Sequence, residues 1–455
     1  MKVPSFKEIL KKYPLRIYCG VTVFLLFAAA FYFDTPQGIM QGMVKIIVSR
    51  DALITDYFEL AGLGASFFNA AVVSVICMLL IGLNKIPYTG LTLAAFYINA
   101  GFAFWGKNPV NIMPIILGVW LYAKLQGIPF ARYIYNALFA TCLGPFVTEM
   151  VYLLPFETKY NIMAAFALGV FIGFAISPLA THTASMHMGY SLFNVGYAAG
   201  ILAFVMFCVL KSYGIETEPV FIWKEGVDEV VLKASILYFA ITFIIGVLMQ
   251  NGNAEGLLKI MRHPGRAVAD FVMMDGPGTT LMNMGAMGLL AEVYIIVIKA
   301  DLNGPTLGCI LTVFGFAAFG AHLRNYIPVL LGVVLSTYFT KYDLTSPAII
   351  IASLFVVGIS PIAGQFGPIV GILAGMLHAA IVTCTSALYG GLNLYNNGFS
   401  AGWVAIIMIP LTESFMRHFE IHKKKHIELR LELKKIREVR EHGRQNLKKH
   451  KEREK

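Results

Sequence analysis

Apolar runs long enough to cross a membrane recur through most of the chain. Five clear examples are Leu15–Phe33, Tyr57–Leu83, Ile162–Leu179, Leu232–Met249 and Ala348–Ile372. A membrane-spanning helix needs about 20 predominantly apolar residues. The pattern therefore predicts an all-α polytopic membrane protein with about 10–14 membrane segments, some of them broken or re-entrant.

One part of this pattern occurs twice. The stretch "GFAFWGKNPVNIMPIILGV" begins at Gly101, and "GFAAFGAHLRNYIPVLLGV" begins at Gly315. Ungapped alignment of residues 90–119 with 304–333 gives 12 identities. The identical pairs include polar and helix-breaking residues, namely Asn111/Asn325, Pro114/Pro328 and Gly118/Gly332. Apolar helices resemble one another by composition, but shared polar residues at a fixed spacing favour an internal duplication.

A second pair of similar stretches follows: "GYSLFNVGYAAG" begins at Gly189 and "GLNLYNNGFSAG" at Gly391. We therefore predict a first membrane repeat over 1–215, a second over 216–412, and a basic helix over 413–455.

The charges between apolar runs indicate the orientation of the repeats. Lys and Arg favour the cytoplasmic side of a membrane. Both ends of the chain are basic, and residues 417–455 carry 15 Lys/Arg against 7 Asp/Glu. The connector 211–233 is rich in Asp and Glu, whereas the next loop, 251–270, is basic. We predict cytoplasmic termini and an external connector, so that the two repeats have inverted topology, an arrangement common in transporters.

The doubled stretches contain short apolar segments, Gly90–Trp105 and Gly304–Phe319. Sixteen helical residues rise about 24 Å, less than the roughly 30 Å hydrocarbon core. In the first copy Asn108 can cap a new helix and Pro109 suits its first turn. Paired broken segments point to a transport site. The alternative is that these are ordinary loops between complete spans and that Asn111 only caps a helix.

The candidate substrate-binding residues are polar or ionisable side chains near these breaks and at matched positions of the two repeats. They are Asn111, Asn325, Asn194, Asn396, Glu149, Gln365, Thr181, Thr183, Thr383, Thr385 and Arg324. Amide side chains donate and accept hydrogen bonds, so they suit a polar or charged solute. Glu149 could carry a proton or coordinate a cation, because ionisable residues at membrane depth are usually functional or paired. It could instead lie at a helix end beside an external loop.

The composition supports the membrane assignment. The chain has 455 residues, of which 57% are hydrophobic and 14% charged, and its net charge is +10. Soluble domains are about 45–50% apolar and about 25% charged. The basic C-terminal helix should attract anionic lipid and could bind a partner or support a homo-oligomer. Nucleic-acid binding is the weaker interpretation of this helix, because it has almost no aromatic residues.

Other motif classes are missing from the sequence. It has no P-loop, so ATP does not drive the protein directly, and it predicts no cofactor. His182 and His187 are five residues apart without further ligands, so no metal site is predicted. The six cysteines lie in apolar segments and should pack there without forming disulfides.

Three functions remain open. The first is a secondary transporter or channel, embedded in the inner membrane of a cell, that moves a small polar or charged solute between the repeats. The second is a scaffold acting through the basic tail. The third is an intramembrane enzyme using His182, His187 and Glu149. Matched helix breaks favour transport, so we expect no enzymatic activity.

The sequence resembles a bacterial and archaeal multi-pass membrane family catalogued as a domain of unknown function. The resemblance depends on three stretches: Glu59 to Ala70, the doubled "GF…FG…N…P…LGV" and "HMGYSLFNVGYAAG". The resemblance covers most of residues 15–412 and implies no activity. "SLFN" and "NLYN" are also faintly similar to an element of urea transporters, which have two inverted halves. The full signature of those transporters is missing, so this likeness implies no substrate.

Overall fold

The computed structural model describes residues 12–217 and 220–418. The chain forms two compact units, 1–406 and 407–455, and all contacts given below lie within the first. Residues 407–418 of the second unit are helical. Most of the predicted basic helix, 413–455, lies outside the described residues.

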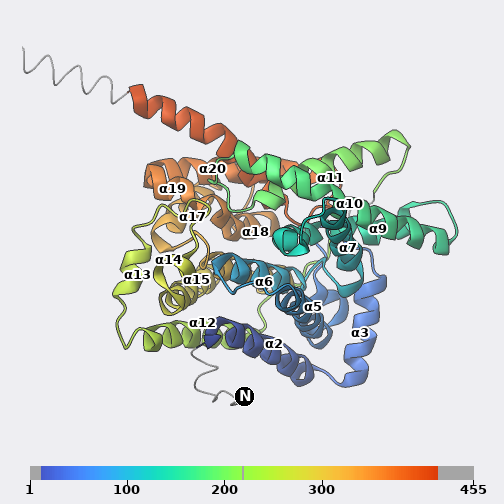
Figure 1. The fold of residues 1–455 in the computed structure, drawn as a ribbon, viewed down its shortest axis with the longest axis horizontal. Helices are drawn as coiled ribbons and strands as arrows, with labels where there is room; N and C mark the ends of the chain where they lie inside the picture. The colour runs from blue at the N-terminus through green and yellow to red at the C-terminus, as the bar shows by residue number, and fades with distance from the viewer. Residues whose placement is uncertain (1–11, 218–219, 419–455) are drawn as a thin grey trace, which may run out of the picture. The chain divides into compact units, whose positions relative to one another are not determined.

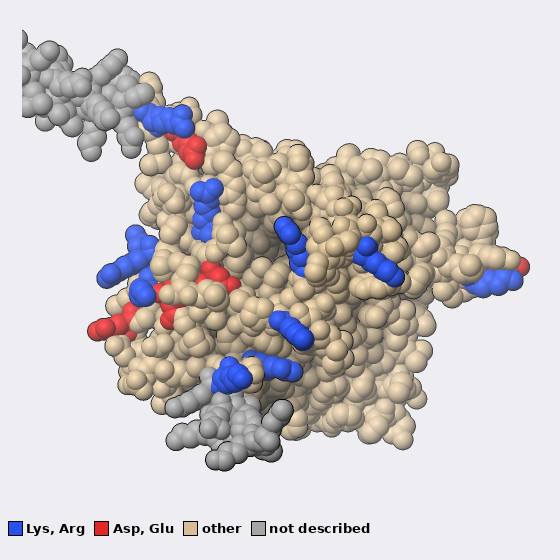
Figure 2. Space-filling model, viewed as in Figure 1, with Lys and Arg blue, Asp and Glu red and all other residues tan. Residues whose placement is uncertain are grey.

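Ten helical segments of the described chain are long and apolar enough to cross a membrane. They are Pro14–Phe33 (α2), Leu63–Leu83 (α5), Phe130–Leu153, Thr158–Met186 (α10), Asn194–Ser212 (α11), Glu229–Met249 (α12), Pro277–Ile298 (α15), Pro347–Phe366, Pro368–Tyr389 and Asn396–His418. Three of these segments join α-helices to 3-10 turns: Phe130–Leu153 contains Ile134–Ala140 (α8) and Gly144–Leu153 (α9), Pro347–Phe366 contains Pro347–Phe355 (α18) and Ser360–Phe366 (α19), and Pro368–Tyr389 contains Pro368–Thr385 (α20). The prediction of a multi-pass helical membrane protein is confirmed. Figure 2 shows scattered charged side chains on a face made mostly of other residues.

Four shorter apolar helices occupy the doubled stretches. They are Gly90–Phe102 (α6), Pro109–Leu125 (α7), Gly304–Phe316 (α16) and Leu323–Ser336 (α17). Nearly every residue of α6 and α16 is buried. At 13 residues each they rise about 20 Å, too short to cross a hydrocarbon core.

The remaining short helices connect these segments. They are Pro36–Val48 (α3), Tyr57–Ala61 (α4), Glu255–Ile260 (α13) and Phe271–Asp275 (α14). Gly62 follows α4 with φ +84°, and Gly276 follows α14 with φ +85°. At a positive φ a Cβ atom would clash with the backbone, and glycine avoids this because it has no Cβ. Each glycine turns the chain directly into a long helix.

The helix break of the first doubled stretch forms as predicted. Asn108 is the N-cap of α7, and its side chain accepts from the backbone N–H groups of Val110 and Asn111. The Asn111 side chain in turn accepts from the Asn108 N–H, which completes a capping box. In the second stretch His322 and Asn325 form the equivalent box at the start of α17. Both predicted asparagines therefore stabilise helix starts.

Helices α6 and α16 cross in antiparallel directions at glycines. A Cβ atom on Gly308 would lie 2.4 Å from the carbonyl oxygen of Gly101, and a Cβ atom on Gly101 would lie 2.4 Å from the oxygen of Gly308. At the other end of the crossing, a Cβ atom on Gly315 would lie 3.3 Å from the Cα of Ala94. Small residues allow this close approach of two backbones.

Aspartates join the two short helices to distant connectors. Asp56 accepts a hydrogen bond from the first N–H of α16, at Gly304, and Asp270 accepts from the first N–H of α6, at Gly90. Asp270 also accepts from Leu91 N at 3.2 Å. Each carboxylate thus compensates the positive end of a helix that is far away in the sequence.

Helices α2 and α12 meet near the start of α2 (Figure 1) and exchange hydroxyl contacts there in the same reciprocal manner. The hydroxyls of Tyr18 and Thr242 are 2.5 Å apart, and those of Tyr238 and Thr22 are 2.8 Å apart. The earlier residue of one helix thus meets the later residue of the other, so α2 and α12 run in opposite directions.

Candidate functional site

A cavity of about 430 Å³ lies beside α6, α8 and the start of α11. Its wall combines residues from both parts of the chain that resemble each other in sequence. Leu91, Ile98 and Tyr135 come from the earlier part, and Phe316 and Tyr395 from the later part. Pockets of about 300–1,000 Å³ with a few polar groups are typical small-molecule sites.

Asn194 is the candidate residue that lines this cavity. Its Nδ2 donates to Ala180 O, and its Oδ1 accepts from the Thr183 hydroxyl at 2.9 Å. His187 Nε2 is also 2.9 Å from that oxygen. These contacts fix the orientation of the amide because its oxygen can only accept.

Asn396 and Thr385 repeat this arrangement at another place. The Thr385 hydroxyl donates to Asn396 Oδ1 at 2.7 Å, and Asn396 Nδ2 donates to Val382 O at 3.0 Å. The Tyr389 hydroxyl also donates to Asn396 Oδ1. The match between the stretches beginning at Gly189 and Gly391 thus extends to their side-chain contacts.

Asn111 lies in a different cluster, around Asp51. Asp51 is fully buried and accepts from the Tyr57 hydroxyl at 2.9 Å, the Thr148 hydroxyl at 3.2 Å and Asn111 Nδ2 at 3.3 Å. Burial raises the pKa of Asp51 to about 7, against the lowering effect of the hydrogen bonds from Tyr57 and Thr148.

Glu149 belongs to the same cluster and is paired. The Arg50 Nη2 donates to its Oε2 at 2.6 Å, and the Arg50 Nε is 3.0 Å from that oxygen. The Glu149 side chain is 1% exposed. Glu149 lies in α9, and this ion pair fixes its side chain; its role in carrying a proton or coordinating a cation stays a prediction.

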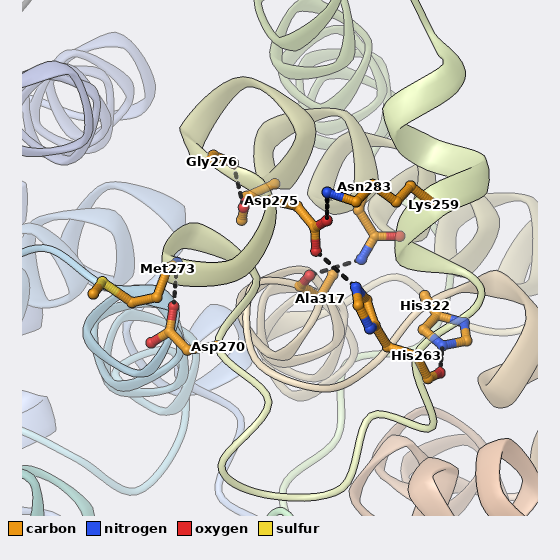
Figure 3. Close-up of polar contacts among 10 residues, drawn as sticks. Lys259, His263, Asp270, Met273, Asp275, Gly276, Asn283, Ala317 and His322 are labelled. Carbon is orange, nitrogen blue, oxygen red and sulfur yellow. Dashed lines mark hydrogen bonds and ion pairs between the residues drawn. The ribbon is translucent and has the colours of Figure 1, made fainter.

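Asn325 lies in a third cluster, which Figure 3 shows in part. His322 Nδ1 accepts from Asn325 N, so its Nε2 donates to His263 O at 2.9 Å. His263 Nε2 and Lys259 Nζ each lie 3.0 Å from an oxygen of Asp275 (Figure 3). The cluster joins the basic loop 251–270 to the break between α16 and α17.

The structure does not gather the candidate residues around the cavity. Asn194 lines the wall, whereas Asn111, Asn325 and Asn396 lie in the separate clusters just described. Other candidates are exposed or bonded within their own helix or to a neighbouring carbonyl: Thr181, Thr383, Gln365 and Arg324. Asn111, Asn325 and Asn396 therefore do not line this cavity.

Sequence reasoning missed Lys107, which is fully buried between α6 and α7. Its Nζ donates to Asn99 Oδ1 at 3.0 Å and to the Tyr395 hydroxyl at 2.9 Å. The signal was available, because Lys107 is a charged residue between two apolar runs. Asp51 was harder to recognise as a candidate from sequence, because it lies in a polar connector between helices.

Four ionisable residues of the earlier part have no ionisable counterpart at the aligned positions of the later part. At the aligned positions of the later part, Pro264 and Gly265 replace Arg50 and Asp51, Ala321 replaces Lys107, and Gln365 replaces Glu149. Within the described ranges, no group of three or more His, Cys, Asp or Glu side chains is arranged to hold a metal ion.

Comparison with known proteins identifies the family. Residues 35–212 and 249–414 match the family described as "Protein of unknown function (DUF1576)". The chain belongs to this family. The two matched segments leave out the connector between the halves and most of α12. Each segment contains one of the two copies that begin at Gly101 and Gly315. Neither the curated proteins nor the solved structures gave a match, so the likeness to urea transporters stays a prediction.

The thermal stability of this DUF1576 protein is expected to fall as the pH rises from about 4 to about 7, between the unfolded and folded pKa values of Asp51. Because the folded-state pKa of Asp51, about 7, is above that of an unfolded aspartate, the folded state binds more protons. That stabilisation is fully present below the pKa of an unfolded aspartate, about 4, and is lost progressively until the pH passes about 7. Asp51→Asn should flatten the dependence of the unfolding temperature on pH. The exposed control Asp343→Asn should retain it, and an unchanged slope in Asp51→Asn would contradict the assignment.

Proposed function

We propose that this DUF1576 protein is a membrane transport protein, a secondary transporter or a channel, that moves a small polar or charged solute between two inverted halves. The halves are 1–215 and 216–412, and the solute site is the 430 Å³ cavity that both halves line. This shared cavity beside broken helices is the observation that carries the proposal.

Reciprocal antiparallel contacts support the inverted relation. Asp56 binds α16 while Asp270, its counterpart 214 residues later, binds α6. Asn69 Nδ2 donates to Ala103 O and Lys107 O, and Asn283, at the same spacing, donates to Ala317 O and Ala321 O. A two-fold axis in the membrane plane accounts for equivalent segments that run in opposite directions. Cytoplasmic termini and insertion in a cell inner membrane complete this proposal.

The enzyme alternative is less well supported by the geometry. Its three candidate residues have separate roles: Glu149 pairs with Arg50, His187 contacts Asn194, and His182 is exposed. The scaffold alternative depends on the basic tail, which lies outside the described residues. Lipid binding and oligomerisation through that tail stay predictions.

A cysteine at Ser191 is expected to react with a charged, membrane-impermeant methanethiosulfonate reagent, because Ser191 lines the cavity. The six native cysteines are first replaced, and labelling is measured in right-side-out and inside-out vesicles. Reaction in only one of the two vesicle preparations indicates a transporter. Reaction in both preparations indicates a channel.

Ser74→Cys is the matched control. Ser74 is as deeply buried as Ser191, but it lies within α5 and away from the cavity wall. It should remain unmodified in folded protein. If the Ser191 cysteine reacts no faster than the Ser74 cysteine from either side, the cavity is not a solute site.

A further inference from the structure

A second, much smaller space lies next to the cavity. Its volume is about 10 Å³, which is close to the least that can hold one water molecule. Ile98, Phe193 and Tyr395 line both spaces, so the two share part of their walls. Phe193 and Tyr395 occupy equivalent positions of the matched stretches that begin at Gly189 and Gly391. One residue from each half therefore belongs to both walls.

The small space is the counterpart of the cavity in the repeat pattern. All of its lining residues except Ile98 occupy positions equivalent to residues that line the cavity. Examples are the pairs Phe102/Phe316, Phe355/Phe139 and Leu394/Leu192. The two spaces are therefore built from the same segments of the two halves, although one is open and the other is nearly filled.

The packing of the shared aromatic residues is repeated as well. The ring centroids of Phe193 and Phe316 are 4.8 Å apart, and those of Tyr395 and Phe102 are also 4.8 Å apart. Phe316 and Phe102 are themselves equivalent residues of the doubled stretches. The small space is thus a closed version of the cavity rather than an unrelated packing gap.

The equivalent edges of the two spaces differ in exposure. Val268 lines the cavity and is 83% exposed. Its equivalent, Ile54, is 7% exposed, and its carbonyl oxygen accepts a hydrogen bond from the N–H of Ile222 at 3.0 Å. The Asp56 N–H donates to the Ile222 oxygen, also at 3.0 Å. The connector between the halves thus covers the segment around Ile54, whereas the equivalent segment at the cavity is exposed.

A hydrogen bond to Lys107 anchors Tyr395 in the wall of the small space. The Lys107 Nζ donates to the Tyr395 hydroxyl at 2.9 Å and to Asn99 Oδ1 at 3.0 Å. At the equivalent positions, Phe193 has no hydroxyl and Ala321 has no amine. Hydrogen bonds from an ammonium group are stronger than those between neutral groups. The closed space therefore has an anchor that the cavity lacks.

We infer that the small space is a second solute site, closed in this structure, which opens toward the opposite membrane face when the cavity closes. Each half then adopts the conformation that its counterpart has here, and Tyr395 leaves Lys107. The solute crosses without a continuous pore, so the protein is a transporter rather than a channel. The inference rests on the proposed function, because it concerns the route through that same site.

A matched pair of cysteines tests this exchange in protein that lacks the native cysteines. Leu192→Cys lies in the cavity wall, and Leu394→Cys lies at the equivalent position of the small space. The probe is the charged methanethiosulfonate reagent. On the proposed orientation, the Leu192 cysteine should react only in inside-out vesicles and the Leu394 cysteine only in right-side-out vesicles. Both should react faster than the Ser74 cysteine.

The double variant with both cysteines tests whether the two openings exclude each other. In detergent the reagent reaches both faces, and mass spectrometry of the intact chain counts the labels. A single label per chain is expected, because a charged adduct in one site keeps that site open and the other closed. If a single variant does not fold, the Ser191 cysteine replaces that at Leu192, and Asn397→Cys replaces Leu394→Cys.

Two kinds of result overturn the inference. A Leu394 cysteine as unreactive as the Ser74 cysteine means that the small space does not open. Two labels on one chain, or a Leu192 cysteine that reacts in both vesicle preparations, mean that the openings do not alternate. In either case a reactive Ser191 cysteine leaves the transport proposal standing. A Ser191 cysteine that does not react refutes the transport proposal itself.

Tyr395→Phe tests the anchor, because it removes the hydroxyl that Lys107 holds and leaves the ring in place. The Leu394 cysteine should then react about tenfold faster in right-side-out vesicles. Tyr326→Phe is the matched control. Tyr326 is fully buried, its hydroxyl donates to Ser353 O at 3.0 Å, and it lines neither space. A rate that changes no more in Tyr395→Phe than in Tyr326→Phe removes the Lys107–Tyr395 bond from the mechanism.

Discussion

Replacing Arg50 with methionine is expected to lower the free energy of unfolding by about 3–5 kcal/mol, because it leaves the buried Glu149 carboxylate without its cation. Arg50 reaches Glu149 through two nitrogen atoms, at 2.6 and 3.0 Å from the same oxygen. The measurement is a detergent-denaturation titration of the purified protein followed by circular dichroism.

Two comparisons make this prediction specific. Lys159→Met removes the exposed Lys159–Glu157 pair, whose side chains are 65% and 70% exposed, and should cost less than about 1 kcal/mol. The double variant Arg50→Met with Glu149→Met removes both charges and should recover most of the lost stability. A loss no larger than that of Lys159→Met would mean that the buried pair is not structurally important.

Replacing Gly308 with leucine is expected to prevent α6 and α16 from packing, with a loss of about 3 kcal/mol or more. The first added carbon alone would lie 2.4 Å from the Gly101 carbonyl oxygen, and both backbones are rigid helices. The readout is the yield of monodisperse protein by fluorescence-detected size-exclusion chromatography, followed by thermal unfolding of any folded fraction.

Gly20→Leu in α2 is the matched control. Gly20 is also helical, but the nearest atom to an added Cβ is the Met78 Cε at 4.0 Å. The control should fold normally, since leucine is the better helix former. A Gly308→Leu variant that folds as well as the control would show that the two short helices are not in close contact.

The local features of this fold could be predicted from sequence because nearby residues determine them. The restart of α7 depends on Asn108 and Pro109, which lie within one helical turn, and both have the predicted roles. The apolar runs similarly predicted the long helices, because length and hydropathy suffice to identify a span.

The contacts between distant segments could not be predicted in this way. The pattern at Asn111 and Asn325 showed that the stretches correspond, but not which neighbours each side chain has. Both amides donate to an equivalent glycine carbonyl, that of Gly106 or Gly320. Asn111 also meets Asp51 and Thr148, whereas Asn325 also meets the basic loop. Similar residues thus lie in different environments because their partners differ between the halves, with Gly265 at the position equivalent to Asp51.

Lys107 shows a different limit. Its charge was visible in the sequence, but its importance depends on Asn99 and on Tyr395, which is 288 residues away. Only the folded chain shows that these neutral groups surround the ammonium and that Tyr395 connects it to a cavity.

The carboxylate of Asp270 at the start of α6 has a consequence for the order of events during synthesis. The Gly90 N–H emerges from the ribosome 180 residues before Asp270 does. At about 5–20 residues per second, that interval is roughly 10–40 s. Throughout it, the first N–H group of α6 lacks the Asp270 carboxylate that accepts its hydrogen bond. A nascent chain should therefore need either water or the insertion machinery at α6 until its second half arrives.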